Sequence, residues 1–95
     1  MPEMHFDIAW PDGTVETCYS PSLVIREHFA QGALYPLAEF VQRSRSALGI
    51  ASDRVQQKYG FPCIRAMAQL ARIEQVADCF ADVPGAAVRI TAFKD

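Results

Sequence analysis

The first twenty residues alternate between apolar and polar side chains, and this pattern predicts a β-hairpin. A period of two is typical of a strand with one buried face. Pro11-Asp12-Gly13 supplies the turn, because proline presets the first turn dihedral and glycine accepts a positive φ. The apolar members of the first strand are Met4, Phe6, Ile8 and Trp10, and the residues between them are His5, Asp7 and Ala9.

A three-residue turn at this place pairs Trp10 with Thr14 and Phe6 with Cys18. Glu16 then falls on the apolar face, where it is the one polar exception. The opposite face of the hairpin carries polar and aromatic side chains, namely His5, Asp7, Thr17 and Tyr19.

Two helices are predicted after the hairpin, the first short and the second long. Ser20-Pro21 indicates a helix start, with serine as the cap and proline at the first helical position, and the helix ends near Gly32. The β-branched residues that follow Pro21 weaken this prediction. A clearer helix runs from Pro36 to Tyr59 and ends at Gly60. Its narrow apolar stripe is Leu37, Val41, Ser44, Leu48, Ala51, Val55 and Tyr59.

Two positions in the long helix do not match an ordinary apolar stripe. Gly49 in the interior costs about 1 kcal/mol relative to alanine, so a kink there with Ser52 as a new cap is one alternative. Ser44 lies inside the stripe, and its hydroxyl is expected to bond to a carbonyl one turn back.

Pro62 begins a further helix that extends to about Phe80 and is apolar on two faces. A helix of this kind is either central in the fold or shared with a second molecule. The main stripe is Ala66, Leu70, Ile73, Ala77 and Phe80. The strip on the opposite side is Ile64, Ala68 and Ala71.

Pro84-Gly85 predicts a turn, and residues 87–93 predict a last strand with Val88, Ile90 and Ala92 inward. The sequence therefore predicts a single α+β domain over residues 1–95. Its N-terminal β-hairpin, two to three helices and C-terminal strand place the helices on one face of a small three-stranded sheet. The last strand is free to join either edge of the hairpin.

Composition indicates the size of the domain, the cellular compartment and the kinds of partner to expect. With 95 residues, 51% hydrophobic and 21% charged, the chain is long enough for one core. Three widely spaced cysteines, no secretory leader and no membrane-spanning stretch favour a reduced, cytoplasmic protein. A net charge of −2 gives no general attraction to nucleic acid. A chain this short also gains stability from self-association, so we expect a homodimer or another homo-oligomer.

Candidate chemistry is sparse, and no catalytic motif is present. Cys63 is the best candidate nucleophile, because it falls at the start of a helix and Arg65 follows closely; Tyr59 or His28 are its candidate companions. The alternative is that Cys63 is a small buried apolar residue. We expect no metal site and no cofactor, because the two histidines and three cysteines lack ligand spacing.

Six of the nine basic residues lie between positions 35 and 74. On the long helix they flank apolar residues, a pattern typical of a protein contact surface, and forked guanidinium groups also bind small anions. The alternative is a solvated face paired with Glu39 and Asp53. The candidate binding residues are Arg43, Arg45, Ile50, Arg54, Lys58, Tyr59 and Arg65.

Four blocks of sequence resemble one family of small bacterial proteins, the nitrogen starvation response family. They read MPEMHFDIAWPDG, CYSPS, YPLAEFVQRSRSALGIASDRVQQKYGF and CIRAMAQLARIE. The resemblance implies a gene cluster that contains a nitrilase and is linked to nitrile or cyanide assimilation. It carries over no catalytic residue.

Three functions follow as hypotheses. The first is a non-catalytic accessory protein that contacts an enzyme of the nitrilase cluster. The second is a sensor that binds a small molecule or anion. The third is a small enzyme dependent on Cys63.

Overall fold

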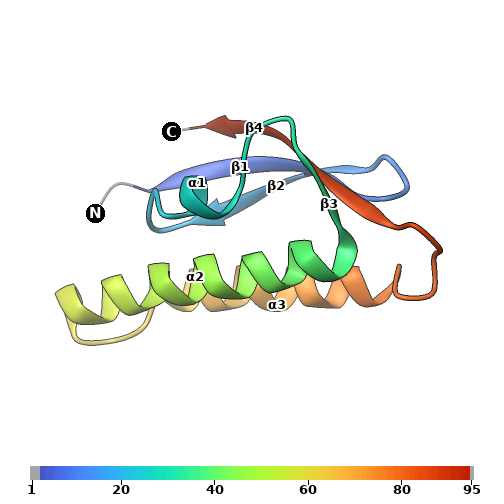
Figure 1. Ribbon diagram of the computed structural model, residues 1–95. Coiled ribbons are helices and arrows are strands. Elements are labelled where there is room, and N and C mark those ends of the chain that lie inside the picture. Colours follow the sequence, from blue (N-terminus) through green and yellow to red (C-terminus); the bar gives the residue numbers. More distant parts are fainter. Residues whose placement is uncertain (1–2, 95) are drawn as a thin grey trace.

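The computed structural model describes residues 3–94 as an antiparallel sheet covered on one face by two long helices (Figure 1). The sheet has the strand order β2-β1-β4-β3. The predicted α+β class is confirmed, but the sheet has four strands because a three-residue strand precedes the long helix. In chain order the elements are β1 Met4–Ala9, β2 Val15–Ser20, α1 Ile25–His28, β3 Leu34–Pro36, α2 Leu37–Tyr59, α3 Ile64–Asp78 and β4 Ala87–Lys94.

The hairpin of β1 and β2 forms as its sequence predicts. The Trp10 amide donates to the Thr14 carbonyl at 2.8 Å, and Phe6 lies opposite Cys18. Gly13 takes a φ of 88°, which an L side chain rarely adopts. Glu16, the polar exception on the buried face, accepts a hydrogen bond from Trp10 Nε1 at 3.3 Å. It therefore satisfies the indole, which would otherwise be an unpaired donor.

The last strand joins the free edge of β1, and a bulge changes which of its residues face the core. The register between β1 and β4 shifts at Asp7 and Ile8, so Ala92 lies opposite Asp7 and Phe93 opposite Phe6. Opposite residues share a face, so Ala92 points away from the helices and Phe93 packs against the core. The prediction that Ala92 faces inward is wrong for this reason.

The helix predicted from Ser20 is mostly absent. Only α1 is helical, because the two serines hold the preceding segment in local turns. Ser20 Oγ donates to the Ser22 carbonyl at 2.7 Å, and the Val24 amide donates to Ser22 Oγ at 3.3 Å. Side chains that bond to nearby backbone groups compete with the helical pattern in this way.

Helix α2 is continuous through Gly49 and ends at Gly60, whose φ is 86°. Its buried face is broader than the predicted stripe, because α2 packs against the sheet, α1 and α3 together. Tyr59, predicted as the last residue of the stripe, is instead 52% exposed, because it lies at the end of the helix beside the turn. The hydroxyl of Ser44 has no hydrogen-bond partner within residues 3–94, so the predicted bond to a carbonyl is wrong. The buried residues are Phe40, Ser44, Ala47, Leu48, Ala51 and Ser52.

Helix α3 uses its main stripe as predicted, with Ala66, Ile73 and Ala77 buried. The opposite strip is exposed, so α3 is not central in the fold. Its Gln69 side chain satisfies one backbone amide at the outer edge of the sheet, because Oε1 accepts from the Tyr19 amide at 2.9 Å.

Candidate functional site

Helices α2 and α3 form a helical hairpin, distinct from the β-hairpin of β1 and β2, and four large apolar side chains are exposed at and near its turn. We call these four residues the hairpin patch. They are Tyr59, Phe61, Ile64 and Met67, with exposed fractions of 52%, 63%, 80% and 50%. Ala68 and Ala71 continue the exposed strip along α3. Several exposed apolar side chains gathered near one turn indicate a contact site more strongly than a single exposed side chain does.

The sequence contained part of the signal for this patch. Ile64, Ala68 and Ala71 were predicted as a second apolar strip, and Tyr59 as a candidate binding residue. Phe61 was missed, although it directly follows the Gly60 stop and so had to lie in a turn. Met67 was also missed, although it is three residues after Ile64 and lies near the same helix face.

Cys63 holds the turn in place, and its thiol already has a structural task. It precedes the first helical residue of α3, and its Sγ accepts the Ala66 amide at 3.4 Å. Its own amide donates to Ser52 Oγ at 3.2 Å. Cys63 shares a hollow of about 210 Å³ with Tyr59, whereas His28 lines a different hollow. Of the two candidate companions, the structure therefore places only Tyr59 near Cys63.

Cys18 is excluded as a nucleophile by its surroundings. It is fully buried beneath the helices. Burial raises the pKa of its thiol, and the nearby Glu16 carboxylate raises that pKa further. The thiol stays protonated and packs as an apolar group.

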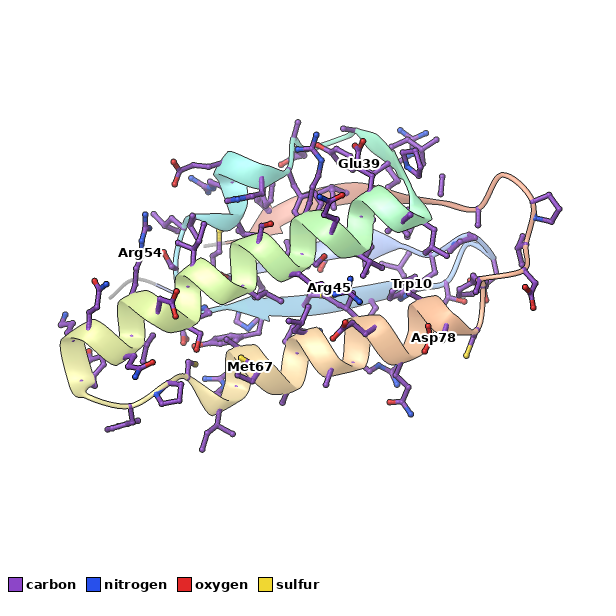
Figure 2. All side chains as sticks on the ribbon, turned by 60° about the horizontal axis from the view of Figure 1, so that its bottom comes forward. Trp10, Glu39, Arg45, Arg54, Met67 and Asp78 are labelled. Carbon is purple, nitrogen blue, oxygen red and sulfur yellow. The ribbon has the colours of Figure 1, made fainter. Side chains whose placement is uncertain are left out.

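The two candidate arginines in the first half of α2 are held by neighbouring groups. Arg43 donates to the His28 carbonyl at 2.8 Å, and its guanidinium lies 4.9 Å from the centre of the Tyr35 ring. Arg45 pairs with Glu74 of α3 at 2.6 Å. Figure 2 shows Arg45 between the two helices, so its ion pair ties α2 to α3.

The candidates nearer the α2–α3 turn also have partners. Arg54 donates to Ser22 Oγ at 3.1 Å, and Arg65 lies 3.8 Å over the Tyr19 ring. Lys58 lies 5.5 Å from the centre of the Tyr59 ring. Ile50 is the exposed apolar residue on the outward side of α2. The seven predicted binding residues therefore spread along the helices and do not converge on one point.

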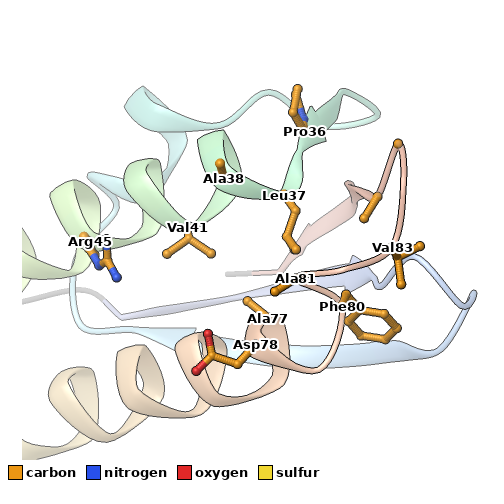
Figure 3. Close-up of a pocket in the computed structure, with 12 residues that line it drawn as sticks. Pro36, Leu37, Ala38, Val41, Arg45, Ala77, Asp78, Phe80, Ala81 and Val83 are labelled. Atoms are coloured by element: carbon orange, nitrogen blue, oxygen red, sulfur yellow. The ribbon is translucent and has the colours of Figure 1, made fainter.

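A groove of about 570 Å³ lies at the other end of the helix pair, between the start of α2 and the end of α3. Figure 3 shows Leu37 and Val41 pointing from α2 toward the α3 side of this end groove. Most of its lining is apolar, and two charged side chains stand at one end. The principal lining residues are Leu37, Val41, Arg45, Asp78, Phe80 and Val83.

The walls of the end groove are fixed by contacts with the core. Phe80 stacks on Trp10 with ring centres 6.1 Å apart. On the other wall, the Leu37 amide donates to the Ala86 carbonyl at 3.0 Å. A groove held in this way exists before any partner binds, so binding loses little entropy in forming it.

The two ends of the helix pair carry opposite unpaired charge. At the end groove, Arg45 is neutralised by Glu74, whereas no ion pair within residues 3–94 engages Asp78 or Asp82. At the hairpin patch, Arg54 and Lys58 also have no carboxylate partner in the described part of the chain. Asp53 offsets one of these two positive charges. The groove end is therefore acidic and the turn end is basic.

The described residues do not suggest a metal centre or a membrane span. Within residues 3–94, no three histidine, cysteine, aspartate or glutamate side chains are grouped so as to hold a metal ion. In the same part of the chain, no helix is both long enough and apolar enough to cross a membrane.

Comparison with known proteins places the chain in a family. The sequence profile of the nitrogen starvation-induced protein NitG matches residues 5–93. The chain belongs to the NitG family. No curated protein and no solved structure matches it significantly. Membership of the NitG family therefore gives a physiological condition, nitrogen starvation, and confirms the resemblance seen in the sequence.

Proposed function

We propose that the chain is a non-catalytic accessory protein of a bacterial nitrogen-scavenging pathway, and that it binds an enzyme of that pathway through the hairpin patch. The observation that carries the proposal is the exposure of Tyr59, Phe61, Ile64 and Met67 at the α2–α3 turn and on the helical residues next to it. Membership of the NitG family supports the setting. The resemblance to nitrilase-cluster proteins supports an enzyme of that cluster as the partner.

The make-up of the patch suits a protein contact. Protein interfaces combine an apolar, aromatic centre with a polar rim that often includes arginine. Tyr59 and Phe61 supply the aromatic centre, and Arg54, Lys58 and Arg65 supply the rim. The Arg65 side chain is already oriented by the Tyr19 ring, so little rotamer entropy is lost when it meets a partner.

The other two hypotheses have less support from the geometry. An anion sensor needs arginines with free donors that converge, but Arg43, Arg45, Arg54 and Arg65 each bond to or stack on a different group. An enzyme dependent on Cys63 needs a base beside the thiol, and His28 lines another hollow. Protein contact requires neither arrangement.

Light scattering after size exclusion tests the proposal, using the chain alone and mixed with the nitrilase of its own gene cluster. We expect a complex with wild-type chain and a loss of at least tenfold in affinity for Ile64→Lys, since a buried unpaired lysine costs more than 1.4 kcal/mol. The matched control is Val15→Lys, because Val15 is 61% exposed on the sheet face turned away from the helices.

Two results would contradict the proposal. One is a mixture in which the chain and the nitrilase elute separately at every ratio. The other is a complex that Ile64→Lys and Val15→Lys weaken equally, because the hairpin patch would then not be the contact.

A further inference from the structure

We propose that copies of this chain assemble head to tail, with the α2–α3 turn of one copy seated in the end groove of the next. We call residues 58–62, which carry this turn, the tip. The inference goes beyond the contact with an enzyme and stands without it, because both surfaces belong to this chain. Its occupant is a second copy, identified by apolar and charge complementarity.

The apolar parts of the tip and the end groove match. The tip presents Tyr59 and Phe61, both more than half exposed. The end groove offers about 570 Å³ lined by Leu37, Val41 and Phe80, a volume in the range of sites that enclose aromatic groups. Aromatic rings that dock into preformed apolar grooves are typical anchors of protein interfaces.

The charges at the two surfaces favour this pairing over the symmetric ones. Lys58 lies in the last turn of α2, at the start of the tip, without a carboxylate partner in residues 3–94, and Arg54 is one turn before it. Asp78 lines the end groove, and Asp82 lies in sequence between two of its lining residues; no ion pair within residues 3–94 engages either carboxylate. Tip against groove joins opposite charges, whereas groove against groove brings the Asp78 carboxylates of the two copies together. Electrostatic complementarity of this kind selects the partner and the orientation.

The positions of the two surfaces determine the form of the assembly. The molecule is 42 Å long and only 22 Å and 17 Å across. In Figure 2, Arg54 and Asp78 mark opposite ends of the helix pair. When copies lie end to end, each pair makes only one tip-to-groove contact and leaves one tip and one groove free, so this arrangement does not close into a dimer. A contact between unlike surfaces then repeats into an open chain.

Each open chain keeps one free tip and one free groove at its ends. A terminal copy therefore still presents its hairpin patch, and an enzyme that binds this patch would stop growth at that end. Self-assembly and enzyme binding are for this reason separable by experiment.

Two single-surface variants test the proposal by complementation. Phe61→Asp disables the tip and leaves the end groove intact. Ala81→Trp fills the end groove and leaves the tip intact, and Ala81 is an exposed lining residue, so the fold tolerates the change. Circular dichroism confirms folding of both variants, and Val15→Asp is the control on the outward sheet face.

The readout is the weight-average mass from sedimentation or light scattering, measured up to millimolar concentration. We expect the mass of wild-type chain and of Val15→Asp to rise with concentration past that of a dimer. Each surface variant alone stays monomeric. An equimolar mixture of the two forms one-to-one dimers and nothing larger, because only one working tip and one working groove remain.

Three outcomes would overturn the proposal. The first is a monomeric wild type at every concentration. The second is a wild type that stops at the dimer, since that indicates a symmetric contact. The third is an equimolar mixture of the variants that stays monomeric. Retained nitrilase binding by Ala81→Trp would show that failure of the assembly leaves the proposed enzyme contact standing.

Discussion

Two buried serines on α2 show how the same residue type takes opposite roles. Ser44 Oγ has no partner within residues 3–94, whereas Ser52 Oγ accepts the Cys63 amide at 3.2 Å and holds the α2–α3 turn. A buried hydroxyl without a partner opposes folding, and one that satisfies a buried donor supports it.

We expect Ser44→Ala to raise the free energy of unfolding by about 1 kcal/mol, because it removes an unsatisfied hydroxyl and favours the helix. Ser52→Ala should lower it by about 1 kcal/mol, since the Cys63 amide loses its acceptor. Urea denaturation of both variants measures the difference. Changes of the same sign would contradict this assignment of roles.

Asp7 on the outward sheet face gives the stability a pH dependence. Its carboxylate accepts from Thr17 Oγ1 at 2.6 Å and pairs with Lys94 at 2.9 Å. The hydrogen bond from Thr17 lowers the pKa of Asp7, and Lys94 lowers it further. A lowered folded-state pKa contributes stability above the unfolded pKa of about 3.9, and this stability is lost as the pH falls through the folded pKa.

Asp7→Asn should therefore be less stable than wild type at neutral pH, by less than about 1 kcal/mol because the pair is near the surface. The difference should vanish in acid, once the wild-type carboxyl is protonated. Thermal unfolding of both proteins between pH 7 and about pH 2 checks the prediction. A gap that stays constant across this range would assign the effect to packing.

At the scale of elements, α2 is continuous where its sequence allowed a kink. Gly49 lies in the helix interior with ordinary backbone geometry, and a Cβ added there meets nothing within 4 Å. The helix stays continuous because residues on both sides of Gly49, including Leu48 and Ala51, are buried. Gly60 differs, because it ends the helix with a φ of 86°.

Gly49→Ala should stabilise the protein by about 1 kcal/mol through helix propensity and a less flexible unfolded chain. Gly60→Ala should destabilise it by about 1 kcal/mol, because alanine disfavours the left-handed conformation. Chemical denaturation compares the two. A destabilised Gly49→Ala would indicate that the glycine serves a contact beyond the chain.

Sequence rules for turns and helix ends predicted the elements correctly where the residue type matches the backbone conformation that the position requires. The turn at Gly13, the stop at Gly60 and the turn at Gly85 all follow from glycine at positive φ. The same rules failed after Ser20, where hydroxyls bond locally, and at Ala92, where a bulge shifts the alternation. Neither a bulge nor competition from side-chain hydrogen bonds leaves a periodic signal.

At the scale of the whole molecule, α3 divides its apolar residues between the core and the surface. Ile73 is fully buried and Ile64 is 80% exposed. Ile73→Ala should cost about 3 kcal/mol by opening a cavity, and Ile64→Ala should change stability by less than about 0.5 kcal/mol. Thermal and urea unfolding measure both. A large cost for Ile64→Ala would assign this residue to folding and remove it from the hairpin patch.

The alternation of residues 4–10, the helical period of α2 and α3 and the glycine stops were sufficient to predict the hairpin, the two long helices and the α+β class. These features depend on interactions between neighbours in sequence, which a local pattern records. The same patterns predicted that α3 carries two apolar faces. They did not show which of the two faces of α3 would be buried in the core.

Only the tertiary structure decided which face of α3 is exposed, which partners the basic residues have and where the end groove forms. Pairing of β4 with β1 set the sheet order, and packing of α3 on the sheet left Ile64 and Met67 outside. Arg45 and Arg54 lie at different places along α2, so they bind different partners, Glu74 and Ser22. The end groove unites residues some forty positions apart in sequence. Contacts over such separations depend on how elements pack, and no local period encodes that packing.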